Sequence, residues 1–255
     1  MSSITDLVRG MKDMRSAVMP ALMIGIVALG AYTFLQLADE VSESEIVGID
    51  RALLLAFRNP ADSTDPIGPA WVEQTVTEIT SLGGYPILVV LVAVVVGYLI
   101  VARRYGPALF VVLSTSLGAV VSQLLKMAYE RPRPDIVNHL VPIHTASFPS
   151  GHATMSTVVY LTLAALIARM VEETRVRVYV ITVAVVLSLT VGLSRIYLGV
   201  HWPSDVAAGW ALGAAWASLA WLVVSGLRAW RRRDATGPTE AGATRQPLAQ
   251  DATKD

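Results

Sequence analysis

Six long stretches of this chain contain no Asp, Glu, Lys or Arg. They occupy residues 16–38, 79–102, 105–125, 153–168, 178–194 and 206–227. An α-helix needs roughly 20 apolar residues to cross the hydrocarbon core of a bilayer, whereas helices buried in soluble proteins are usually shorter and carry a polar face. The run at 153–168 is the shortest, but Arg169 at its end can extend its side chain to the interface. The sequence therefore predicts an all-α, six-transmembrane helical bundle.

The composition agrees with a membrane protein. Charged residues make up 16% of the chain and hydrophobic residues 54%, whereas a soluble domain carries about 25% charged residues. The first apolar run ends at Leu37-Ala38-Asp39 without a small-x-small cleavage pattern, so we interpret it as a retained anchor. The chain has no cysteine, which excludes a disulfide framework, a thiol nucleophile and a Cys-based metal site. The net charge of zero by itself indicates no partner, and we predict no nucleic-acid binding.

The cations are distributed unevenly between the two sides of the predicted bundle. Counted up to Arg233, twelve Lys and Arg residues fall on the side of the two termini and six on the other. Cytoplasmic loops carry the excess of cations, so both termini are predicted to be cytoplasmic. Segments 39–78, 126–152 and 195–205 then lie outside. The compact loops favour a multi-pass protein of a prokaryotic inner (plasma) membrane, with the outer segments facing the periplasm or exterior.

The predicted organisation has three parts: a cytoplasmic N-terminal segment 1–15, a membrane domain 16–227, and a basic and then disordered cytoplasmic tail 228–255. The outer segment 39–78 is polar. Within it, residues 46–57 mix apolar side chains with Asp50 and Arg51, which favours a short helix at the membrane interface. Arg58-Asn59-Pro60 is expected to end that helix.

Three polar clusters stand at span ends on the predicted outer side. They are Lys126-x6-Arg133-Pro134 after the third span, Pro149-Ser150-Gly151-His152 opening the fourth, and Ser194-Arg195-x5-His201-x3-Asp205 between the fifth and sixth. A helix that begins near Ser150 presents unpaired backbone N–H groups to an anion, and Gly151 permits close approach. Asp205, four residues after His201, can orient its imidazole. Lys126, Arg133 and Arg195 supply positive charge, as phosphoryl transfer requires.

Each cluster by itself is a weak signal. A single His at a helix end is usually a structural residue, and we interpret His139 and His144, which lack a matched partner, in that way. The outer cations can also bind lipid headgroups or pair with the acidic residues of segment 39–82. The combination of three clusters, in this order and on one predicted face, carries the functional interpretation.

Together the three motifs closely resemble those of the type 2 phosphatidate phosphatase family of lipid phosphatases, which shares its motif with vanadium haloperoxidases. All motif positions are present between residues 126 and 205, and the six-span layout extends the resemblance over about 16–227. The resemblance implies that His201 is the nucleophile, forming a phosphohistidine, that Asp205 orients it, and that His152 is the acid and base. It assigns phosphate binding to Lys126, Arg133, Ser150, Gly151 and Arg195. It also implies no metal and no other cofactor.

The expected substrate is a lipid phosphate in the bilayer, such as phosphatidate, phosphatidylglycerophosphate or a polyprenyl diphosphate. The sequence does not distinguish among these and does not indicate an oligomeric state. Two alternatives use the same features. A transporter or binding protein for an anionic lipid or organophosphate needs the cations and helix ends but not His201 and Asp205. A vanadium-dependent haloperoxidase needs a similar pocket, but known enzymes of that kind are soluble and six spans argue against it.

Overall fold

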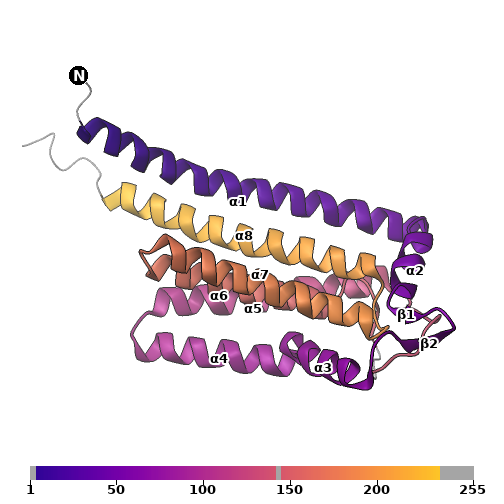
Figure 1. The fold of residues 1–255 in the computed structure, drawn as a ribbon. Helices are drawn as coiled ribbons and strands as arrows, with labels where there is room; N and C mark the ends of the chain where they lie inside the picture. Colours follow the sequence, from indigo (N-terminus) through magenta and orange to yellow (C-terminus); the bar gives the residue numbers. More distant parts are fainter. Residues whose placement is uncertain (1–3, 142–144, 236–255) are drawn as a thin grey trace, which may run out of the picture. The chain divides into compact units, whose positions relative to one another are not determined.

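The structure is a computed structural model that describes the backbone of residues 4–141 and 145–235. The chain up to Leu222 forms one compact unit, and Val223 onward forms a second. The described elements are α1 (Ile4–Glu43), α2 (Val47–Leu55), β1 (Arg58–Asn59), β2 (Asp62–Pro66), α3 (Ala70–Thr80), the 3-10 helix η1 (Ser81–Gly83), α4 (Tyr85–Val101), α5 (Tyr105–Tyr129), α6 (Gly151–Met170), α7 (Thr174–Tyr197) and α8 (Pro203–Ala235). The predicted helical fold is confirmed, with one short antiparallel hairpin, β1–β2, added in the outer segment (Figure 1).

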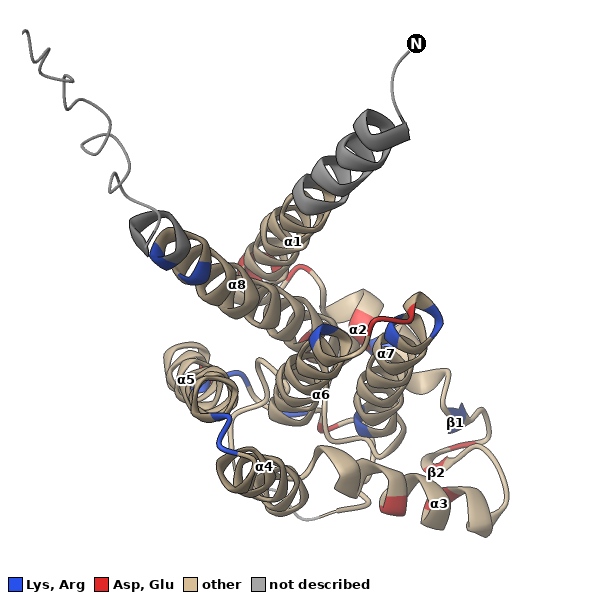
Figure 2. Ribbon diagram, turned by 90° about the vertical axis from the view of Figure 1, so that its left-hand side faces the viewer, with Lys and Arg blue, Asp and Glu red and all other residues tan. Residues whose placement is uncertain are grey.

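Five described helices are long and apolar enough to cross a membrane by themselves. They are the Val18–Glu43 part of α1, α5, α6, α7 and the Pro203–Arg231 part of α8. A sixth span results if Ala70–Gly83 and Tyr85–Val101, which meet at an angle of 47°, are taken as one bent span. The second predicted span, 79–102, is therefore a single helix only from Tyr85 onward. Figure 2 shows the charged residues gathered at helix ends and in the connecting segments, as insertion in a bilayer requires.

The bend before α4 has a local cause. Pro86 stands in the first turn of α4, where its missing N–H costs no helical hydrogen bond, and Gly84 is extended with φ −72° and ψ 140°. A Cβ added at Gly83 would overlap Val191 Cγ1 and would lie 3.4 Å from His152 Cδ2. Glycine at this position therefore lets the bend pack closely against α7 and against the start of α6.

The outer segment contains more structure than its sequence indicated. The short helix expected within residues 46–57 is present as α2. The hairpin β1–β2 and the helix α3 follow it, and neither was expected. Figure 1 shows α2 and the hairpin at one end of the helical bundle. The predicted N-terminal segment 1–15 belongs largely to α1, and the basic part of the predicted tail belongs to α8 up to Ala235. The disorder expected for the remaining tail concerns residues outside those described.

The helix α6 lies at the centre of the bundle, which explains why its apolar run is the shortest. In its membrane-spanning window 67% of the residues are buried, compared with 22% for α7 and 33% for α5. Surrounded by protein, α6 accommodates polar residues that would be costly against lipid. Ser156 and Thr157 donate hydrogen bonds to the Ala153 carbonyl, and Thr162 hydrogen-bonds Ser114 of α5 at 3.0 Å.

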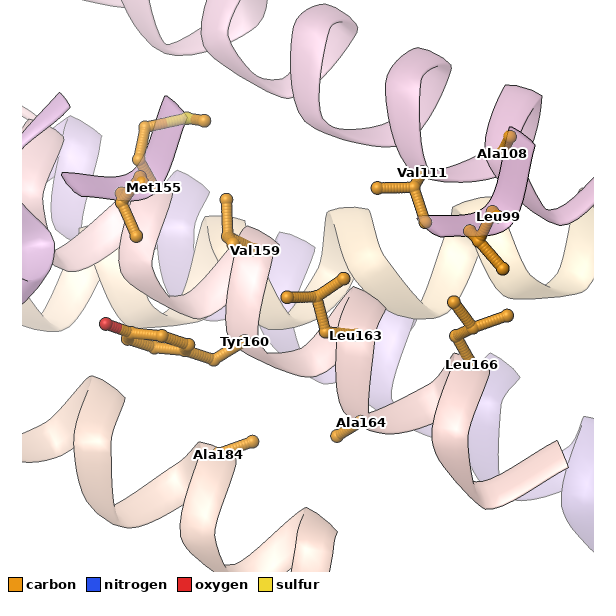
Figure 3. Close-up of a cluster of buried hydrophobic side chains, with 11 residues drawn as sticks. Leu99, Ala108, Val111, Met155, Val159, Tyr160, Leu163, Ala164, Leu166 and Ala184 are labelled. Carbon is orange, nitrogen blue, oxygen red and sulfur yellow. The ribbon is translucent and has the colours of Figure 1, made fainter. Parts of the chain in front are cut away.

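The apolar core surrounds this central helix. Leu88 and Leu99 of α4, Val111 of α5 and Ala184 of α7 pack on it. Figure 3 shows Leu163 and Leu166 of α6 on the side of Leu99 and Val111, while Ala164 lies on the side of Ala184. α8 approaches α6 through small residues, because a Cβ added at Gly213 would lie 2.7 Å from Thr157 Cβ. This close packing holds the first turns of α6 and α8 together.

Candidate active site

The three sequence motifs meet at the end of the bundle where α5 ends and where α6 and α8 begin. Nη1 of Arg133, from the first motif, lies 3.1 Å from Nε2 of His201, from the third. The Ser150 amide, in the second motif, donates to the Asp205 carbonyl at 3.0 Å. A Cβ added at Gly151 would lie 3.3 Å from Lys126 Cε. Residues predicted from separate stretches of sequence are therefore neighbours in the structure.

The hydrogen bonds of His201 define its tautomer. The ring is only 2% exposed. Nε2 faces a guanidinium, which can only donate, so this nitrogen carries the lone pair. Nδ1 lies 3.4 Å from Asp205 Oδ2, which can only accept when ionised, so Nδ1 carries the proton. This is the tautomer that leaves Nε2 free to act as a nucleophile.

The charge of His201 is also controlled by its surroundings. Burial, together with the nearby Arg133 and Lys126, lowers the pKa of His201 to about 3, although Asp205 opposes the shift. The imidazole is therefore neutral at physiological pH. A neutral ring with an unprotonated Nε2 fits attack on phosphorus.

Asp205 is fixed by the start of α8. It is the third residue of that helix, and its Oδ2 accepts a hydrogen bond from the Trp202 amide at 2.9 Å, in the manner of a capping box. The Ser147 hydroxyl donates to the same oxygen. Arg131 Nη1 donates to Oδ1 at 2.6 Å. The predicted interaction between Asp205 and His201 is present, but Asp205 has partners that the motif alone does not indicate.

The start of α6 presents several unpaired donors. Ser150 precedes the first helical residue, yet its side chain makes no capping bond, and its Oγ is buried without a partner among the described residues. The first-turn amides of α6 have no helical acceptor, and their end of the helix dipole is positive. Nε of Arg195 is likewise buried and unpaired, while its Nη1 donates to Thr80 Oγ1 at 3.1 Å. These donors fit an anion.

The cations Lys126, Arg133 and Arg195 form no ion pair with a carboxylate within the described chain. Backbone carbonyls hold two of them instead: Lys126 Nζ donates to Ala146 O at 2.8 Å, and Arg133 Nε donates to Thr145 O at 2.8 Å. Burial lowers the pKa of Arg133 to about 10, so it stays charged at neutral pH. The positive charge of this group is left uncompensated, which is the electrostatic requirement of a site for phosphate.

His152 lies in the first turn of α6. Its side chain makes no hydrogen bond to any described residue, but it lies within electrostatic range of Lys126, Arg133 and Arg195. The same Lys126 and Arg133 act on His201, which places both imidazoles around one cluster of cations. A ring without a fixed partner is free to exchange a proton with a bound ligand.

Other sequence interpretations can also be compared with the structure. Nε2 of His139 lies 2.6 Å from the Pro134 carbonyl, as expected for a structural residue, whereas His144 is outside the described residues. Pairing of outer cations with segment 39–82 occurs at Arg131, which contacts Asp50 at 2.8 Å. Sequence reasoning missed Asp50, Arg131 and Ser147 as part of the site. The part of the chain that the structure describes holds no group of three His, Cys, Asp or Glu residues placed to bind a metal.

Comparison with known proteins agrees with this geometry. The sequence profile of the PAP2 superfamily matches residues 107–229. The chain is 31% identical over 186 residues to phosphatidylglycerophosphatase B of Bacillus subtilis, covering 71% of this chain and 85% of that protein. It is 35% identical over 127 residues to decaprenylphosphoryl-5-phosphoribose phosphatase of Mycobacterium tuberculosis, covering 49% of this chain and 65% of that protein.

The fold is also similar to a solved structure. The crystal structure of a transmembrane PAP2-type phosphatidylglycerolphosphate phosphatase from B. subtilis matches with a TM-score of 0.67 and 28% identity, over 80% of this chain and 96% of that one. From its motifs, its fold and these relatives, the chain belongs to the PAP2 superfamily, in the branch of bacterial membrane lipid phosphatases.

Proposed function

We propose that this protein removes a phosphate group from a membrane lipid through a phosphohistidine at His201. The observation that supports this most strongly is Nε2 of His201 in contact with Arg133, in a site whose cations Lys126, Arg133 and Arg195 have no carboxylate partner in the described chain. A phosphate group would neutralise these cations, and a binding site for an anion alone would not need the oriented pair of His201 and Asp205.

The first step is attack by Nε2 of His201 on the phosphorus atom. The N–P bond forms while the bond from phosphorus to the leaving oxygen breaks, and that oxygen takes a proton from His152. Arg133 Nη1 now occupies the space beside Nε2, so it must turn from the ring to a phosphate oxygen when substrate binds. Positive charge develops on the His201 ring as the bond forms, and the carboxylate of Asp205 stabilises it.

The second step is hydrolysis of the phosphohistidine. His152, now neutral, takes a proton from water as the water oxygen bonds to phosphorus and the N–P bond breaks. Inorganic phosphate leaves, His201 becomes neutral again, and His152 is protonated for the next cycle. Acid–base catalysis of this kind contributes on the order of 10²–10⁴ in rate. Lys126, Arg133 and Arg195, with the Ser150 hydroxyl and the amides that follow it, would hold the equatorial oxygens.

An apolar groove supports a lipid as substrate. It has a volume of about 310 Å³ and lies between α4, α5 and α6, with Val92, Ala119 and Val159 among its lining residues. Tyr85 also lines it, and the Tyr85 hydroxyl would lie 3.9 Å from a Cβ added at Gly151. One residue that lines the groove therefore lies beside the start of α6, and a lipid that placed its tail in the groove would bring its headgroup toward His201.

The proposal includes the orientation of the protein in the membrane and the identity of its lipid substrate. The excess of cations on the side of the termini supports an inner-membrane protein with cytoplasmic termini and a site facing the periplasm or exterior. The names of the relatives support phosphatidylglycerophosphate or a decaprenyl-linked phosphate as substrates, beside phosphatidate and polyprenyl diphosphates. The membrane domain 16–227 would carry the whole reaction, without metal.

The test is release of inorganic phosphate by purified protein from a panel of monophosphate and diphosphate lipids, in detergent and in bilayers. We expect turnover of at least one lipid, lost in His201→Gln. His139→Gln is the matched control, because its side chain can still donate to the Pro134 carbonyl. Phosphate release that is undiminished in His201→Gln would eliminate the nucleophile, and tight lipid binding without turnover would favour a binding protein.

A further inference from the structure

The carboxylate of Asp205 is held by two side chains outside its own motif as well as by groups within it. It is completely buried. Its Oδ1 accepts from Arg131 at 2.6 Å, and its Oδ2 accepts from the Ser147 hydroxyl and the Trp202 amide, whereas His201 is farther away at 3.4 Å. The orientation that Asp205 offers to His201 therefore depends on these other partners.

Arg131 links Asp205 to a second buried carboxylate. Its Nη2 donates to Asp50 Oδ2 at 2.8 Å, and its Nη1 also donates to the Ser204 hydroxyl at 2.8 Å. The ring of Trp202 lies 5.6 Å from the guanidinium carbon. A guanidinium that bridges two carboxylates in this way has a fixed plane, which a lysine at the same position would not provide.

Asp50 connects this bridge to the outer segment. It belongs to α2, and its side chain is 1% exposed. Its Oδ1 accepts from the Ser204 amide at 2.8 Å, and its Oδ2 accepts from the Ser204 hydroxyl at 2.5 Å. The Ser204 amide is one of the orphan donors in the first turn of α8, where a negative charge is favourable. Asp50 thus fixes the turn from which Asp205 projects.

Asp205 lies among several charged or titratable side chains. The charged or titratable described groups acting on Asp205 are Arg131, His201, Lys126 and Arg133, with Asp50 across the guanidinium. Without Arg131, two buried carboxylates would face each other with no cation between them. Two like charges that face each other in a buried site repel, so Arg131 favours the state in which both carboxylates are ionised.

We infer that Asp50 and Arg131 are positioning residues that keep Asp205 ionised and oriented against His201, so that the outer segment helps to build the catalytic centre. The inference rests on the proposed phosphatase function. Neither side chain hydrogen-bonds Lys126 or Arg195, the proposed phosphate-binding residues, whereas Arg131 bonds Asp205 directly, so both residues would act on the reaction through Asp205.

The experiment compares Asp50→Asn and Arg131→Gln with the exposed controls Asp39→Asn and Arg51→Gln, which remove the same charges elsewhere in the chain. We expect kcat to fall about 10–100-fold in Asp50→Asn and Arg131→Gln, the range typical of residues that orient a reacting group through a hydrogen bond. KM should change little, because binding of phosphate is left intact. The acidic limb of kcat should move to higher pH in Arg131→Gln, and Arg131→Lys should restore that limb but only part of kcat.

A double variant tests whether the two residues act as a unit. If they do, Asp50→Asn combined with Arg131→Gln loses little more activity than Arg131→Gln alone. Should Arg131→Gln fail to fold, the fall in kcat at little-changed KM is measured in Asp50→Asn and Arg131→Lys instead.

A merely structural role gives a different pattern. The inference is overturned if the variants lose thermal stability while kcat per folded molecule and the acidic limb stay as in the parent protein. Failure of the parent protein to hydrolyse any lipid phosphate would instead refute the proposed function, so the two failures are distinguishable.

Discussion

Replacing Arg133 by Ala is the most direct test of the proposed electrostatics. Its guanidinium touches His201 Nε2 at 3.1 Å, so a phosphoryl group bound to that nitrogen would lie about one contact distance from the charge. Two unit charges about 4 Å apart interact by about 4 kcal/mol at an effective dielectric constant of about 20. Because Arg133 is only partly buried, solvent reduces this value. We expect kcat/KM to fall about 10²–10³-fold, since about 1.4 kcal/mol corresponds to tenfold.

The same substitution changes the pH dependence in a defined direction. Arg133 contributes to lowering the pKa of His201, so its removal raises that pKa. The nucleophile must be neutral, and a higher pKa means that protonation removes it at a higher pH. The acidic limb of kcat/KM, which reports the free enzyme, should therefore move toward neutral pH in Arg133→Ala.

The assay is phosphate release at saturating and limiting lipid concentration between pH 4 and pH 9. The parent protein should show a bell-shaped profile, because one imidazole must be neutral and the other charged. Arg133→Lys should recover part of the activity, and Arg51→Ala, at an exposed position of α2, should change neither parameter. A loss of less than threefold in Arg133→Ala, or an unmoved acidic limb, would refute the assigned role.

Three further predictions concern the bend, the groove and folding. Gly83→Ala should lower kcat and cost about 1–3 kcal/mol of stability, measured by thermal unfolding in detergent, because the added methyl meets Val191 and His152. Ala93→Trp, which fills part of the groove, should lower kcat/KM about tenfold for long-chain lipids by displacing about two methylene groups, and should leave short-chain phosphates unaffected. Between about pH 6.5 and pH 3 the unfolded state binds a proton at His201 that the folded state does not, so stability should fall as pH falls, and His201→Gln should remove that part of the slope.

The number of membrane spans could be read from the sequence because lipid imposes a simple rule. A helix in hydrocarbon must satisfy its own backbone and can carry few charges, so each span is visible as an uncharged run. The second span is the exception. Its run begins at 79, but Gly84 and Pro86 break the helix, and the straight part begins at Tyr85. The shortest run, in α6, needs no lipid-facing surface, because α6 is central.

The proposed members of the site could be named from the sequence because phosphate chemistry requires particular residue types at particular helix ends. His201 and Asp205 are one helical turn apart, and Ser150 opens α6, so local geometry already indicates what each can do. Their meeting around one cluster of cations depends on the packing of α5, α6 and α8, which no single stretch of sequence specifies.

By itself the sequence determined the membrane fold, the three motifs and the chemistry they imply, because these depend on local composition and short spacing. Only the tertiary structure decided which of the described cations pair with carboxylates and which do not. Arg131 and Arg133 are two residues apart in the same motif region, yet Arg131 is paired with Asp50 and Asp205, while Arg133 faces His201. Charge pairing of this kind depends on distances between residues 74 and 81 positions apart in the chain, which are set by packing alone.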